Sequence, residues 1–74
     1  MKSVQDHDRL AAERFAEALR RAQAEFLEMP GLTLTVAQAS RLWSFDSALC
    51  SEVLSTLVER RFLIRTRNQR FARG

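Results

Sequence analysis

Five arginines lie within residues 61–74 of this 74-residue chain, and no acidic residue accompanies them. That segment carries a charge of +5, whereas residues 1–29 and 30–60 each carry −1. Charge of one sign in a short segment attracts polyanions, and the planar guanidinium group suits phosphate oxygens better than a lysine ammonium does. The alternative is a solvated basic tail that aids solubility. The candidate phosphate ligands are Arg65, Arg67, Arg70 and Arg73.

The composition argues against catalytic, metal or cofactor chemistry. One cysteine (Cys50) and one histidine (His7) are too few for a zinc site built by the protein alone. The two glycines, Gly31 and Gly74, provide no glycine-rich phosphate loop. A domain of this length also has little room to enclose a catalytic cleft. We therefore expect no enzyme activity, no cofactor and no metal, and we expect Cys50 to be a small buried apolar residue.

The hydropathy pattern shows no membrane segment. No uninterrupted apolar run exceeds three residues, whereas a transmembrane helix needs about 20. The lone cysteine allows no internal disulfide, which is typical of a reducing compartment. We therefore expect a soluble, cytoplasmic domain that has no membrane partner.

The elements that position the arginines can be predicted from the spacing of apolar residues. From about residue 4 to residue 28, apolar side chains recur every three or four positions, which predicts one long amphipathic helix. Pro30-Gly31 ends it, because proline has no amide hydrogen to donate. The predicted inner stripe consists of Ala11, Phe15, Ala18, Leu19, Ala22, Phe26 and Met29.

A second face of this helix carries small residues. Ala12, Ala16 and Leu27 fall to one side of the inner stripe, and small side chains let another helix approach closely. One interpretation is a homodimer contact through this helix. The alternative is that the alanines only raise helix propensity and that the following strand covers Leu27.

Two short helices and a hairpin are predicted after Gly31. Residues 32–34 alternate as a very short strand. Thr35 and Gln38 form a capping box that begins a helix of about two turns, and Asp46 caps a third helix that runs to about Arg60. Residues 62–66 and 70–73 are predicted strands joined by a turn at 67–69. The predicted inner residues are Val36, Ala39 (or Ala37), Leu42 and Trp43 in the second helix and Cys50, Val53, Leu54, Leu57 and Val58 in the third.

Three stretches match a known family pattern: Leu34-Thr35-Val36-Ala37-Gln38-Ala39, the helix from Asp46 to Arg60, and Leu57-Val58-Glu59-Arg60-Arg61-Phe62-Leu63-Ile64-Arg65. Together they resemble the positioning helix, the recognition helix and the start of the wing in the winged helix-turn-helix family of small bacterial DNA-binding regulators. The resemblance implies an α+β fold with three helices and a two- to three-stranded antiparallel sheet. It also implies a single domain over residues 1–74, with a leading helix (1–29), a strand and helix-turn-helix (32–60) and a short wing (61–73).

The sequence departs from the family pattern at Arg61, where the family usually has glycine. A left-handed conformation there costs a non-glycine residue roughly 1 kcal/mol. We therefore expect the turn at this position to take another form.

The resemblance implies a transcriptional regulator that binds double-stranded DNA. The recognition helix would face the groove with Ser47, Ser51, Ser55 and Thr56, while Arg65, Arg67, Arg70 and Arg73 would hold backbone phosphates. No residue on the outer face of that helix is basic, and serine and threonine discriminate poorly between bases. The alternative function is a protein–protein interaction module that keeps the fold. It would bind a protein partner through the neutral face of the third helix or through the alanine flank of the first.

Overall fold

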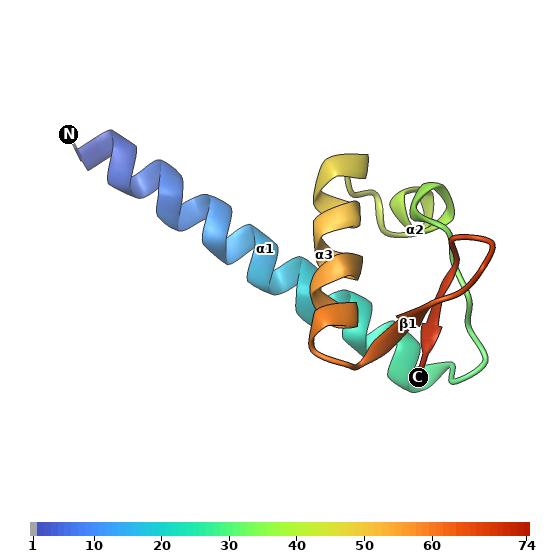
Figure 1. Cartoon of the computed structure of the whole chain (residues 1–74). Coiled ribbons are helices and arrows are strands. Elements are labelled where there is room, and N and C mark those ends of the chain that lie inside the picture. The colour runs from blue at the N-terminus through green and yellow to red at the C-terminus, as the bar shows by residue number, and fades with distance from the viewer. Residues whose placement is uncertain (1) are drawn as a thin grey trace.

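The computed structural model describes the backbone of residues 2–74 and the side chains of residues 9–74. Its elements are α1 (Lys2–Glu28), α2 (Val36–Trp43), α3 (Ser47–Glu59), β1 (Leu63–Arg65) and β2 (Phe71–Arg73). Within that range the fold is α+β, with three helices and a two-stranded antiparallel sheet, which confirms the predicted class. The other elements gather around the C-terminal half of α1, and its N-terminal half projects away from them (Figure 1). The molecule therefore measures 45 × 20 × 20 Å.

α1 is longer than the rest of the fold can cover. Four side chains of its C-terminal half are buried: Ala18, Leu19, Ala22 and Phe26. Phe15 is half-buried and Ala11 is exposed, so the predicted inner stripe is correct only where another element lies against it. Met29 was predicted inside, but it follows the last helical residue and is 45% exposed. Leu27 is 55% exposed, so the expectation that the following strand covers it is wrong.

Side-chain caps begin α2 and α3, as the sequence predicts. Gln38 N donates to Thr35 Oγ1 at 3.1 Å, and Thr35 N donates to Gln38 Oε1 at 3.0 Å, which completes a capping box. Leu49 N donates to the Asp46 carboxylate at 2.7 Å. Between the helices Ser44 adopts a left-handed conformation with φ 58°. These local hydrogen bonds fix where both helices begin.

A Schellman motif ends α3. Phe62 N donates to Leu57 O and Arg61 N donates to Val58 O, both at 2.9 Å, which are the two hydrogen bonds that define the motif. Arg61 occupies its left-handed position with φ 63°. The expectation of another kind of turn is therefore wrong, because the two hydrogen bonds hold the arginine in a conformation that usually selects glycine.

The C-terminal hairpin pairs β1 with β2 in the register Leu63↔Arg73, Ile64↔Ala72 and Arg65↔Phe71. Both predicted strands are present, but each is shorter in the structure than the predicted ranges 62–66 and 70–73, by two residues and by one residue respectively. The predicted strand at residues 32–34 is reduced to one bridge. Leu34 N donates to Phe71 O at 3.1 Å, and Phe71 N donates to Leu34 O at 2.7 Å. This bridge holds the hairpin against the segment that leads into α2.

The core lies where α1, α2, α3 and the hairpin meet. Trp43 is buried as predicted, with its ring edge-on to Phe26 at a centroid distance of 6.2 Å and tilted against Phe45 at 5.8 Å. The Trp43 Nε1–H has no hydrogen-bond partner among the described residues. Leu42 was predicted inside and is 52% exposed, because Ala39 and Trp43 occupy the inner side of this two-turn helix.

Candidate nucleic-acid interface

A polar hollow of about 620 Å³ separates the hairpin from α2 and α3. We call it the hairpin hollow. It combines the first turn of α2, one residue of α3, and the end of the hairpin that carries the turn. Its lining residues are Thr35, Val36, Ala37, Ser51, Arg65, Arg67, Asn68, Gln69 and Phe71.

The hairpin turn places two arginines on one wall of this hollow. Arg65 is the last residue of β1, and its guanidinium lies over the Phe71 ring at 5.0 Å from the centroid. Thr66 N donates to Arg70 O at 2.8 Å, and Gln69 N donates to Thr66 O at 3.1 Å, so residues 67–69 form the predicted turn. Arg67 is exposed at the start of that turn. The structure therefore brings Arg65 and Arg67 together beside Ser51.

The other two candidate arginines lie apart from this pair. Arg70 is half-buried, and its Nη1 donates to Gln38 Oε1 at 3.4 Å, which directs it towards α2. Arg73 pairs with Leu63 at the end of the sheet opposite the turn, and its guanidinium lies over the Phe62 ring at 4.3 Å. None of the four candidate guanidinium groups pairs with a carboxylate in the part of the chain that the structure describes.

The first turn of α2 adds backbone donors to the same hollow. The capping box satisfies the amides of Thr35 and Gln38, and the amides of Val36 and Ala37 have no partner within residues 2–74. Both residues line the hollow beside the two arginines. Unpaired amides at a helix N-terminus favour anions. The sequence reveals the capping box, but its position opposite the arginines depends on the Leu34–Phe71 bridge.

The four candidate residues on α3 do not share one environment. Ser51 lines the hairpin hollow, and Ser47 is exposed at the first position of the helix. Ser55 and Thr56 are half-buried and line a groove of about 480 Å³ between α1 and α3. We call this second feature the α1–α3 groove. Its lining residues are Phe15, Ser51, Glu52, Ser55, Thr56 and Glu59.

Cys50 is a packing residue and not an exposed nucleophile. It is fully buried, and its thiol lies 3.7 Å from the Val36 carbonyl oxygen, towards which the S–H can donate. Burial raises the pKa of the Cys50 thiol, and the Asp46 carboxylate raises it further. A raised pKa keeps the thiol protonated and unreactive at neutral pH.

Within residues 9–74, no three side chains of His, Cys, Asp or Glu come together as metal ligands. No helix among the described residues has the length and apolar character needed to cross a bilayer. No known family model matches the chain, and no curated protein or solved structure is significantly similar to it.

Proposed function

We propose that this chain is a winged-helix protein that binds double-stranded DNA and acts in transcriptional control. In this proposal α2 and α3 form the helix-turn-helix and the hairpin forms the wing. The observation that carries the proposal is the hairpin hollow, where Arg65, Arg67, Ser51 and two unpaired amides of α2 surround one polar depression. This combination of donors is suited to a phosphate of the duplex backbone.

The arrangement of the strands supports the winged-helix assignment. The segment before α2 bridges to β2 at Leu34, and β2 pairs with β1, which gives a small antiparallel sheet beside the helix-turn-helix. The hairpin follows directly after α3, and its turn reaches towards the start of α2 (Figure 1). A duplex that contacts α3 can therefore also meet the basic turn of the hairpin.

The charges indicate mostly sequence-independent binding. Two phosphate contacts, from Arg65 and Arg67, correspond to a log–log salt slope of about −1.8, and four contacts correspond to about −3.6. At 100° per residue, Glu52 and Glu59 lie about 200° and 180° from the buried Cys50, so they point outward from α3. Acidic residues there repel phosphates and offer few contacts for reading purines. We infer that α3 sits near the groove and that the wing supplies most of the affinity.

A dimer would bind a duplex more tightly than one copy with so few phosphate contacts. We propose that two copies associate through α1, whose N-terminal half projects from the body (Figure 1). Leu10 is 57% exposed on that half, Ala12 is exposed and Ala16 is half-buried. Two wings would roughly double the salt slope. They would also place two recognition helices on half-sites about 34 Å apart.

The test compares two doubly substituted proteins of equal net charge. Arg65→Gln/Arg67→Gln removes both wing arginines of the hairpin hollow, and Arg20→Gln/Arg41→Gln removes two exposed arginines of α1 and α2. Binding to a short mixed-sequence duplex is measured by amide-shift titration at low and moderate salt. We expect the wing variant to bind every duplex more weakly, with a salt slope flatter by about 1 for each phosphate that it no longer neutralises. Equal affinities for the two variants would refute the assignment of the wing.

A second candidate function is a protein–protein interaction module, favoured by the α1–α3 groove. Phe15 supplies an aromatic floor there, and Glu52 and Glu59 supply acidic rims, so the groove suits a basic amphipathic partner. Substitution of Glu52 by lysine separates the two functions. Under the DNA proposal Glu52→Lys strengthens duplex binding, whereas under the interaction proposal it disrupts a partner complex.

A further inference from the structure

A third depression lies between α1 and the turn that joins α2 to α3. It has a volume of about 550 Å³, within the usual range for sites of small ligands. We call it the α1–turn hollow. Neither the DNA proposal nor the interaction proposal uses it. Its lining residues are Arg14, Glu17, Ala18, Arg21, Ser44, Phe45, Asp46 and Leu49.

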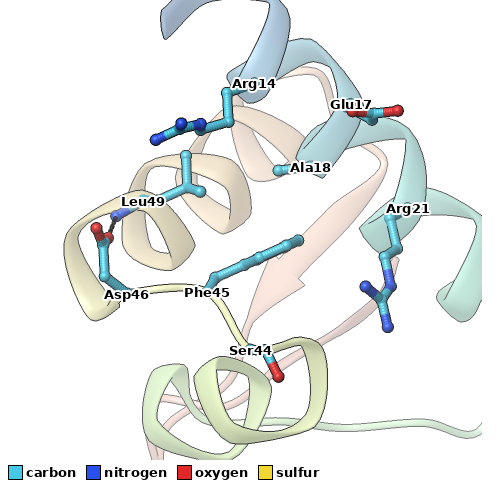
Figure 2. Close-up of a pocket in the computed structure, with 8 residues that line it drawn as sticks. All are labelled: Arg14, Glu17, Ala18, Arg21, Ser44, Phe45, Asp46 and Leu49. Carbon is cyan, nitrogen blue, oxygen red and sulfur yellow. Dashed lines mark hydrogen bonds between the residues drawn. The ribbon is translucent and has the colours of Figure 1, made fainter.

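An aromatic ring forms the middle of this hollow. Phe45 is half-buried, and its ring is held by tilted contact with Trp43 at 5.8 Å. Figure 2 shows the ring lying between the two ends of the hollow and extending towards Ala18. A flat apolar group can therefore lie between α1 and the turn, in contact with the aromatic ring and the alanine methyl group.

Cationic and hydroxyl groups lie at the ends of the same hollow. Figure 2 shows Arg21 and Ser44 at one end and Arg14 with Leu49 at the other. Neither arginine forms an ion pair among the described residues, and the Ser44 hydroxyl has no hydrogen bond there. The two arginines are seven residues apart on α1, which corresponds to about 10 Å along the helix axis.

The two carboxylates of the hollow leave the Arg21 end open to an anion. Asp46 lies at the opposite end, and its carboxylate already accepts the Leu49 amide at 2.7 Å as the cap of α3. Figure 2 shows the Glu17 carboxylate directed away from Phe45. The end formed by Arg21 and Ser44 therefore offers a charged donor and a neutral donor to the same group.

We propose that the α1–turn hollow binds a small planar aromatic carboxylate. Its ring lies against Phe45 and Ala18, and its carboxylate accepts hydrogen bonds from the Arg21 guanidinium and the Ser44 hydroxyl. A bound ligand joins α1 to the helix-turn-helix unit, and because it binds the folded chain it raises the melting temperature. This proposal does not depend on DNA binding.

The test uses benzoate, with benzamidine as a cationic probe of the same shape. Both are titrated into the full chain while amide shifts and the fluorescence of Trp43, the single tryptophan, are recorded. We expect benzoate to shift the amides of Ala18 and of residues 44–46 and to perturb the Trp43 emission through Phe45. Benzamidine should shift these signals less than benzoate does, because its amidinium group is repelled by Arg21.

Two neighbouring arginines of α1 provide the matched variants. Arg21→Gln should weaken benzoate binding by about tenfold, which is the effect of removing one charge-assisted hydrogen bond. Arg20→Gln changes the net charge equally at an exposed residue outside the hollow and should bind as the unaltered protein does. The proposal is overturned if benzamidine binds as well as benzoate or if the two variants bind benzoate equally. It is also overturned if the shifts lie at the hairpin hollow instead.

Discussion

Replacing Arg61 by glycine should stabilise the protein. Arg61 holds a left-handed conformation, φ 63°, as the residue after the C-cap of α3. That conformation costs a residue with a Cβ atom about 1–2 kcal/mol, whereas glycine adopts it without strain. Glycine also adds about 0.4–1 kcal/mol of chain entropy to the unfolded state, which offsets part of the gain. We expect Arg61→Gly to raise the unfolding free energy by about 0.5–1 kcal/mol, which raises the melting temperature of a domain this small by about 2–8 °C.

The assay is thermal unfolding followed by far-ultraviolet circular dichroism, and two controls separate conformation from charge. Arg60→Gly removes the same charge one residue earlier, where φ is −82°, and should destabilise by roughly 0.5–1 kcal/mol. Arg61→Ala removes the charge but keeps the Cβ atom, so its melting temperature should stay close to that of the unaltered protein. If Arg61→Gly and Arg61→Ala shift the melting temperature equally, conformational strain at Arg61 is not the cause and the reasoning fails.

Three further predictions test the interface, the dimer and the core. Glu52→Lys should increase duplex affinity at low salt, measured by fluorescence anisotropy, because it replaces a repelled carboxylate on α3 with a cation; an unchanged affinity would place α3 away from the phosphates. Ala16→Glu should give a monomer by light scattering, and an unaltered mass would contradict dimerisation through α1. Because burial raises the pKa of the Cys50 thiol, its contribution to the unfolding free energy should be constant below about pH 8 and should fall as the pH rises further. The Cys50→Ala variant should not show the decrease in unfolding free energy that comes from ionisation of this thiol.

The sequence predicts those elements whose signals are local. Thr35 and Gln38 lie three residues apart, and both hydrogen bonds of their capping box are formed. Asp46 caps α3 by a similar local contact. Pro30 ends α1 because it has no amide hydrogen. Each of these features depends on groups within a few residues of one another, so the rest of the fold does not have to be known.

The predictions that failed depend on contacts between distant segments or on backbone strain. Leu42 has the spacing of an inner residue, but its side chain is 52% exposed in the structure. Leu34 bridges to Phe71 across most of the C-terminal half, which periodicity does not reveal. Arg61 adopts a left-handed conformation without being glycine, so the usual sequence signal for the turn that ends α3 is missing.

For the candidate site too, the sequence predicts the features that depend on neighbouring residues and not those that depend on contacts between distant segments. The excess of arginine near the C-terminus is visible in the composition, but the composition treats the four candidates as equivalent. The hairpin register separates them, since Arg65 lies at the turn end of β1 and Arg73 lies opposite the start of that strand. The packing of α1 against α3 likewise determines the surroundings of each serine on α3. Ser55, for example, lines the same groove as Phe15 of α1.

The distribution of charge around α3 determines how a duplex would have to approach. Glu52 and Glu59 line the α1–α3 groove, whereas Arg65 and Arg67 line the hairpin hollow, and Ser51 belongs to both. A phosphate backbone is therefore attracted on the hairpin side of Ser51 and repelled on the α1 side. A duplex centred on the outer face of α3 would meet both carboxylates, so the DNA proposal requires a position displaced towards the hairpin. In that position the unpaired amides at the start of α2 and the two arginines can contact one strand, and the projecting half of α1 remains free to bind a second copy.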